Sequence, residues 1–297
     1  EMMTYYLGID IGGTAIKYGI GNPGEELRLA SSIPTPQTGL KEFLHVTRKL
    51  IHELMDQNPD IAGIGIATPG TIDRKSGMLL GVNPNLRWWI RKSPLDIVPD
   101  EFRKIAVCDN DANLMTLAEA QSTLGVVLGI TVGTGIGSGL VLNGRIYHGS
   151  QGFALEAGHM CVQRDGLKCS CGLSGCLEAY SSVSAIRKAA RQIDPKYASC
   201  GLDELLQDAR RTPGLQTIIK RGRDFLSMGL ANLAMLLDPD VIVIGGGAME
   251  AGLYDIDQIA MTIAANTAKV NHHTAIQKAK TGNLAGVIGA ILLAAQE

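Results

Sequence analysis

The sequence predicts an α/β protein of two similar lobes with a cleft between them. A strand, a glycine-containing turn and a second strand occur twice, near residues 5–20 and 126–142, and each opens a series of strands followed by helices. The 297 residues suffice for one large domain or two of ordinary size. We therefore expect one lobe over residues 1–122 and another over 123–297. The sequence leaves open whether the last helix packs on the first lobe.

Composition indicates a globular protein and argues against several classes of partner. Hydrophobic residues make up 45% of the chain and charged residues 19%, which is ample for a core. The net charge is −2 and no long run of one sign occurs, so nothing points to nucleic acid or to a membrane surface. No stretch reaches the roughly 18 apolar residues of a membrane span, and the first residues lack a signal-peptide pattern. We expect a cytoplasmic protein.

Periodicity and turn residues place the elements of both lobes. The first lobe is expected to hold strands near 5–11, 17–20, 27–33, 61–66 and 105–108, with helices near 40–57 and 112–121. The second is expected to hold strands near 126–132, 137–142 and 241–244, with helices near 184–193, 201–209, 215–237 and 284–295.

The first glycine turn follows the first strand, in the segment Asp10–Lys17. Gly12 and Gly13 would let the backbone approach a phosphate with no Cβ in the way, and the Thr14 hydroxyl can donate to phosphate oxygens. Asp10 can hold Mg²⁺ directly or through water. The alternative is a plain hairpin turn.

Two further glycine turns follow strands in the second lobe. The segment Thr131–Gly139 contains Gly133-Thr134-Gly135 but no Gly-Lys-Ser/Thr, and a strand follows it, so it is neither a P-loop nor a Rossmann turn. The segment Gly245–Gly247 would let a flat adenine or ribose lie against the backbone. The alternatives are a glycine-rich hairpin for the first turn and an ordinary strand-to-helix turn for the second.

Together these turns resemble the phosphate-1, phosphate-2 and adenosine motifs of the actin-like ATPase (ribonuclease H-like) fold, and the whole chain resembles the ROK family (repressors, open reading frames, kinases). The residues that carry the resemblance are Asp10–Lys17, Asn110–Asn113, Thr134–Gly137, Glu156–His159 and Cys169–Glu178. It implies a two-lobed sugar kinase with an interlobe cleft that binds ATP and Mg²⁺. The cofactor-binding residues would be Asp10, Gly12, Gly13, Thr14, Lys17, Thr131, Gly133, Thr134, Gly135, Gly245, Gly246 and Gly247.

Asp111 is the candidate catalytic base. A sugar hydroxyl is a poor nucleophile, and a carboxylate within hydrogen-bond reach can accept its proton as the O–P bond forms. The alternative is that the segment Asp109–Asp111 caps the helix expected to begin near Ala112. The resemblance also implies a set of sugar-binding residues: Gly70, Asn83, Asn110, Asp111, Glu156, His159 and Glu178. As alternatives, Glu178 would be a solvated charge at a helix start and Asn83 a turn former.

A cluster of cysteines suggests a metal site. Cys169, Cys171 and Cys176 lie within eight residues, and with His159 they offer a tetrahedral donor set suited to Zn²⁺. Four protein ligands leave no open position, which predicts a structural metal. The resemblance places zinc on these four residues and implies that His159 binds metal with one ring nitrogen and sugar with the other. The alternative is free thiols in a loop.

The resulting hypothesis is transfer of the γ-phosphoryl group of ATP to a hexose, with the 6-hydroxyl of glucose as first choice. N-acetylmannosamine, N-acetylglucosamine, allose, fructose and a β-glucoside remain alternatives. Leu155 and Asp109 depart from the family pattern, which has Gly and Glu there, and they weaken the choice of sugar. A sugar-sensing transcription regulator is the non-enzyme alternative, disfavoured because the first motif begins almost at residue 1. The family also suggests a homodimer.

Overall fold

The computed structural model describes residues 4–80, 86–123, 125–269 and 273–297. The chain forms two compact units. The first contains Glu1–Ser122, Gly144–Ala154 and Asn283–Glu297, and the second contains Thr123–Asn143 and Leu155–Gly282. The first unit therefore begins with the expected residues 1–122, and it also takes in residues 144–154 and the last helix, whose placement the sequence left open.

The first unit is built on a five-stranded sheet of order β3-β2-β1-β4-β7. The strands β1, β2 and β3 pair antiparallel, and β1, β4 and β7 pair parallel. The elements are β1 (Tyr5–Ile11), β2 (Ala15–Gly21), β3 (Leu29–Pro34), α1 (Leu40–Gln57), β4 (Ile61–Thr68), β5 (Thr71–Asp73), β6 (Met78–Leu80), β7 (Ala106–Asn110), α2 (Asp111–Glu119), β10 (Arg145–Ile146) and α9 (Ala285–Ala294).

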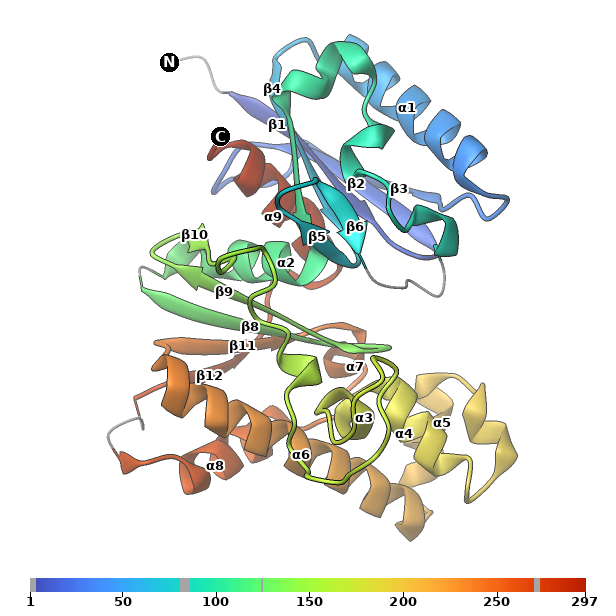
Figure 1. Cartoon of the computed structure of the whole chain (residues 1–297), viewed down its shortest axis with the longest axis vertical. Helices are drawn as coiled ribbons and strands as arrows, with labels where there is room; N and C mark the ends of the chain where they lie inside the picture. Colours follow the sequence, from blue (N-terminus) through green and yellow to red (C-terminus); the bar gives the residue numbers. More distant parts are fainter. Residues whose placement is uncertain (1–3, 81–85, 124, 270–272) are drawn as a thin grey trace. The chain divides into compact units, whose positions relative to one another are not determined.

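The two faces of this sheet carry different residues, and this difference decides which helix covers each face. Large side chains such as Ile9 and Ile64 point to one face, where they pack with Phe43 of α1 in a buried cluster. Glycines occupy the alternate positions and face α9. Figure 1 shows the red helix α9 lying among the blue and green elements of the chain's first part.

Gly65 provides the closest approach between β4 and α9. A Cβ on this residue would lie 1.8 Å from the backbone oxygen of Ala290, which cannot rotate away. We expect Gly65→Ala to destabilise the first unit by about 3 kcal/mol, because α9 must shift off the sheet. Thermal unfolding of the full chain measures this.

Gly63→Ala is the matched control on the same strand. Its added methyl would meet the Tyr6 ring at 3.2 Å, where an aromatic side chain can move, and the Ala294 oxygen at 3.5 Å, which is ordinary van der Waals contact. We expect a loss below about 1 kcal/mol for this variant. Equal losses for both variants would contradict the proposed tight contact between β4 and α9.

The second unit repeats the plan with its own strands in the order β9-β8-β11-β12, part of a five-stranded sheet. Strands β8 and β9 form an antiparallel pair, and β11 lies parallel between β8 and β12. Its elements are β8 (Val126–Val132), β9 (Ile136–Leu142), α3 (Glu178–Ser181), α4 (Val183–Ala190), α5 (Leu202–Ala209), α6 (Pro213–Leu237), β11 (Val241–Gly245), α7 (Gly247–Glu250), α8 (Ile256–Asn266) and β12 (Ala275–Lys278).

One core cluster joins this second sheet to its helices. Leu128, Ile130 and Val132 alternate along β8 toward residues such as Leu226 and Leu230 of α6. The yellow and orange helices of Figure 1 form this layer. Within the described part of the chain, no helix is long and apolar enough to cross a membrane.

Candidate functional site

The first glycine turn joins β1 to β2, and hydrogen bonds from nearby residues hold its backbone. The Gly12 N–H donates to the Ala15 oxygen at 2.9 Å, and the Thr35 hydroxyl donates to the Gly12 oxygen at 2.7 Å. The Gln37 amide donates to the Gly13 oxygen at 2.9 Å. Thr14, at the tip, is exposed. The carbonyl oxygens of the turn are thus engaged by the protein, which leaves the exposed tip for a ligand.

Asp10 and Lys17 face each other across the two strands of this turn. Their registers pair directly, and Nζ of Lys17 lies 3.8 Å from a carboxylate oxygen of Asp10. Lys17 also donates to the Asn283 oxygen at 2.9 Å. A Cβ on Gly286 of α9 would lie 2.6 Å from Cγ of Asp10, so α9 closes the space behind this carboxylate.

Asn110 and Asp111 lie where β7 ends and α2 begins. The Asn110 side chain caps α2, accepting from the N–H groups of Ala112 and Asn113 at 2.9 and 3.4 Å. Its amide also donates to the Gly70 oxygen at 3.0 Å, which brings two predicted sugar ligands together. The capping alternative therefore applies to Asn110, and Asp111 is left exposed in the first turn of α2.

The surroundings of Asp111 favour its use as a proton acceptor near neutral pH. Loss of hydration to the surrounding protein and then the charge of Asp10 raise the pKa of Asp111 to about 7. The N–H of Ala112, 2.8 Å from Asp111 Oδ1, opposes this shift. Burial likewise raises the pKa of Asp10, against the charge of Lys17. Two carboxyl groups with raised pKa values in one corner are typical of a functional site.

The second and third turns lie side by side in the second unit. Gly245, which ends β11, pairs with Thr131 of β8. Gly246 has φ of 93°, a conformation that favours glycine, and a Cβ there would lie 2.5 Å from the Val132 oxygen. Gly133 has open space where a Cβ would stand. The adjacency of the two turns is what binding of one nucleotide by both would require.

Glu178 connects the second turn to the cysteine loop. One carboxylate oxygen accepts from the Ile136 N–H at 3.0 Å, next to Gly135. The other accepts from the Ser170 hydroxyl at 3.2 Å. This carboxylate is therefore fixed by two segments, so the alternative of a freely solvated helix-start charge does not describe it.

The predicted metal ligands converge within the second unit. One ligand atom from each of His159, Cys169, Cys171 and Cys176 lies within 4.8 Å of all the others. The sulfurs of Cys171 and Cys176 are 3.7 Å apart, as are the Cys169 sulfur and Nδ1 of His159. Tetrahedral Zn²⁺ with Zn–S of about 2.3 Å and Zn–N of about 2.0 Å requires separations of about 3.8 and 3.5 Å. The donor set and its spacing fit zinc.

The segment before His159 is strained at Leu155. This residue has φ of 62°, in the left-handed region that costs a non-glycine residue about 1–2 kcal/mol. The Ser138 hydroxyl contacts the Leu155 oxygen and accepts from the Ala157 N–H at 3.1 Å, which holds Glu156 between them. The strain explains why glycine would suit this position. The predicted sugar ligand Asn83 lies outside the described residues.

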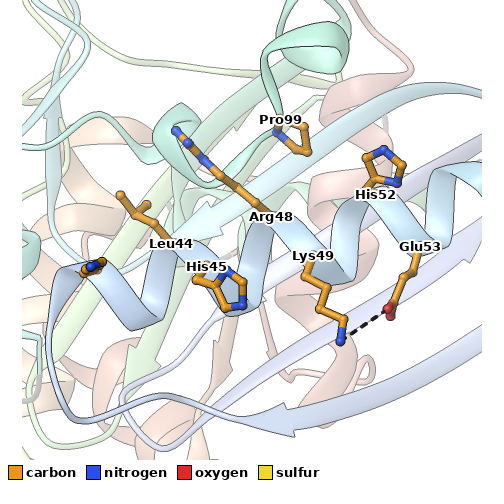
Figure 2. Close-up of a pocket in the computed structure, with 8 residues that line it drawn as sticks. Leu44, His45, Arg48, Lys49, His52, Glu53 and Pro99 are labelled. Atoms are coloured by element: carbon orange, nitrogen blue, oxygen red, sulfur yellow. Dashed lines mark ion pairs between the residues drawn. The ribbon is translucent and has the colours of Figure 1, made fainter.

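An open groove elsewhere on the first unit does not involve the predicted site. It follows the surface of α1, where Figure 2 shows Arg48 and His52 on the side of the helix near Pro99 and Lys49 on the opposite side. Lys49 pairs with Glu53 at 3.8 Å. No predicted site residue among those that the structure describes lines this groove.

Besides Thr35 and Gln37 at the first turn, the sequence gives no sign of the polar residues Ser170, Arg74 and His148, which contact candidate site residues or their immediate neighbours. Ser170 contacts Glu178, as described above. Arg74 and His148 both contact the buried carboxylate of Asp109, next to Asn110. Arg74 and His148 are 35 and 39 positions from Asp109 in the sequence, so no local pattern could have indicated them.

Comparison with known proteins agrees with these features. The model of the family described as the ROK family matches residues 6–297. A glucokinase from Halalkalibacterium halodurans is 32% identical, covering 99% of this chain and 96% of its own. An N-acetyl-D-glucosamine kinase from Citrobacter koseri is 31% identical, and the match covers 97% of this chain and 98% of that kinase. The crystal structure of a ROK family glucokinase from Streptomyces griseus in complex with glucose and AMPPNP superposes with a TM-score of 0.81 at 27% identity, covering 99% and 100%.

Proposed function

This chain belongs to the ROK family and is a sugar kinase, and we propose that it transfers the γ-phosphoryl group of ATP to the 6-hydroxyl of glucose. The observation that carries the proposal is Asp111, an exposed carboxylate with a pKa raised to about 7 at the start of α2. Such a group is about half ionised at neutral pH, and its ionised form is basic enough to take a proton from a hydroxyl.

In the proposed reaction the first unit supplies the base and one phosphate turn. Asp111 accepts the proton of the sugar hydroxyl as the oxygen attacks the γ-phosphorus. The bond from that phosphorus to the bridging oxygen of ADP breaks in the same step. The exposed tip around Gly13 and Thr14 donates to phosphate oxygens. Mg²⁺, when bound, would neutralise charge on the phosphates, and Asp10 is the residue that would hold it.

The second unit would supply the remaining contacts. The Gly133–Gly135 and Gly245–Gly247 turns lie together and suit the phosphates and adenosine of one nucleotide. Glu156, Glu178 and His159 are the proposed ligands of the sugar hydroxyls. Zinc on His159 and the three cysteines would use Nδ1 of the imidazole, which leaves Nε2 for a hydroxyl. The homodimer stays a prediction.

The test is ADP release with Mg²⁺ and ATP against a panel of sugars. We expect glucose to stimulate turnover to about 1–100 per second. The control is 6-deoxyglucose, which lacks only the accepting hydroxyl and should give no phosphorylated product. The panel includes N-acetylglucosamine, N-acetylmannosamine, allose, fructose and a methyl β-glucoside.

The outcomes separate the parts of the proposal. Stimulation by an N-acetylated sugar alone would keep the phosphoryl transfer and overturn the choice of glucose. Product from 6-deoxyglucose would overturn the 6-hydroxyl as acceptor. No stimulation by any sugar, with the protein folded, would overturn the proposed reaction.

A further inference from the structure

Asp109 is a buried carboxylate whose two oxygens are used for different purposes. The residue is 2% exposed. Oδ1 accepts from the Asn110 N–H at 2.7 Å and from the Asn113 side-chain amide at 2.9 Å. Oδ2 lies 2.6 Å from Nη2 of Arg74 and 2.6 Å from Nε2 of His148. One oxygen therefore holds the start of α2, and the other faces two basic side chains.

The basic side chains keep this carboxylate ionised inside the protein. Burial favours the neutral form, but the hydrogen bond from His148 and the charges of His148 and Arg74 outweigh it and lower the pKa of Asp109. An ionised carboxylate accepts stronger hydrogen bonds than a neutral one, so the bonds to Asn110 and Asn113 depend on these two partners.

Both basic residues come from segments distant from Asp109 in the sequence and contact other parts of the first unit. Arg74 follows β5, and its side chain packs against Gly152, where a Cβ would lie 2.6 Å from Cγ of Arg74. His148 lies in the segment Gly144–Ala154 that belongs to the first unit. Nε2 of His148 also contacts Nη2 of Arg74. We call these three residues, Arg74, Asp109 and His148, the clamp.

We propose that Arg74 and His148 are positioning residues for the phosphoryl transfer, acting through Asp109 on the turn that carries Asn110 and Asp111. This inference rests on the proposed function. The link is short: Asp109 holds the Asn110 N–H, and Asn110 caps α2 and holds the Gly70 oxygen. If the turn is loosened, the Asp111 carboxylate shifts relative to the sugar hydroxyl. A displacement of about 1 Å can cost about 100-fold in rate.

The test compares Arg74→Ala and His148→Ala with the conservative variants Arg74→Lys and His148→Gln. We expect kcat to fall about 10- to 100-fold in the alanine variants, with KM for ATP within about twofold of wild type. His148→Gln, which can place an amide donor near Oδ2, should recover part of the loss. The matched control is His52→Ala, which removes a histidine paired with Asp56 at 3.0 Å on the surface of the same unit.

A second measurement follows the turn without relying on turnover. Hydrogen exchange of peptides covering residues 108–115 should be faster in Arg74→Ala and His148→Ala than in wild type or His52→Ala, because Asp109 loses a basic partner and its hydrogen bond to the Asn110 N–H weakens. Thermal unfolding identifies any alanine variant that does not fold, and the conservative variants then carry the comparison.

Unchanged kcat and exchange in both alanine variants, matching His52→Ala, would overturn the inference while leaving the kinase intact. A fall in kcat with an equal rise in KM for ATP would indicate that the variants disturb the whole protein, and would also overturn the positioning role of Arg74 and His148. If the wild type turns over no sugar, the proposed function fails by itself. Exchange alone then decides whether the clamp holds the turn.

Discussion

Asp111→Asn is expected to lower kcat by about 10²–10⁴-fold, because the amide cannot accept the proton of the sugar hydroxyl. The change keeps the size of the side chain, so loss of activity would not reflect lost packing. Steady-state kinetics on glucose and ATP measures it. The control is Asp100→Asn, whose side chain is 86% exposed in the same unit and should leave kcat unchanged.

The pH dependence gives the same prediction a second measurement. A base must be unprotonated, so wild-type kcat/KM should rise with pH through a pKa of about 7 and level off above it. The residual activity of Asp111→Asn should lack this rise. Near-normal turnover in Asp111→Asn, or an identical pH profile, would remove Asp111 from the proposed role.

The raised pKa of Asp111 also means that its ionisation lowers the stability of the folded protein. Its folded pKa exceeds the ordinary value of 3.8, so ionisation at higher pH costs the folded state more than the unfolded one. The penalty grows between pH 4 and 7 and is fully present above pH 7. Because Asp111 is exposed, solvent screens its charge, and we expect this ionisation to cost the folded state only about 1 kcal/mol. Asp111→Asn should therefore unfold about 2–4 °C above wild type at pH 8 and no higher at pH 4.

Removal of zinc is expected to have the other large effect. The purified protein should carry one zinc per chain by elemental analysis. At free zinc about 1,000-fold above Kd the bound ion adds about 4 kcal/mol, so chelation should lower Tm by roughly 10 °C. Cys176→Ser should lose both the metal and this stability. The ordered loop also holds Ser170 against Glu178, so KM for the sugar should rise more than KM for ATP.

Cys161→Ser is the control for this prediction. Cys161 is exposed and pairs in a backbone bridge with Cys176, yet it lies outside the four-residue cluster. This variant should keep zinc and Tm. Protein without zinc after growth in zinc-supplemented medium, or equal loss of metal in both variants, would contradict the assignment.

Local signals in the sequence explain the parts of the fold that could be predicted. Periodic apolar residues set the bounds of α1 as residues 40–57, and the glycine turns mark the strand ends of both sheets. The helix α8 was missed although Asp255 caps it and Ile259 and Ile263 repeat at helical spacing. The hairpin β5–β6 and strand β12 are too short to give a clear pattern.

Contacts between distant segments explain what the sequence could not reveal. The cysteine cluster was visible because three of its ligands lie within eight residues. The clamp was not, because Arg74 and His148 lie 35 and 39 positions from Asp109 in the sequence and contact it only in the folded chain. The return of residues 144–154 and 283–297 to the first unit has the same cause. The packing of α9 on the first sheet depends on glycines such as Gly65, which leave room for a helix far along the chain.

The position of α9 in the chain affects the order in which the protein can be made. The ribosome completes β1, β4 and α2 early, but the helix that covers the glycine face of their sheet emerges only after the whole second unit. The second unit can therefore fold during translation, whereas the first must wait with one face uncovered. A nascent chain stalled before residue 283 would present that face to chaperones and proteases, so loss of α9 would harm the part of the chain that is made first.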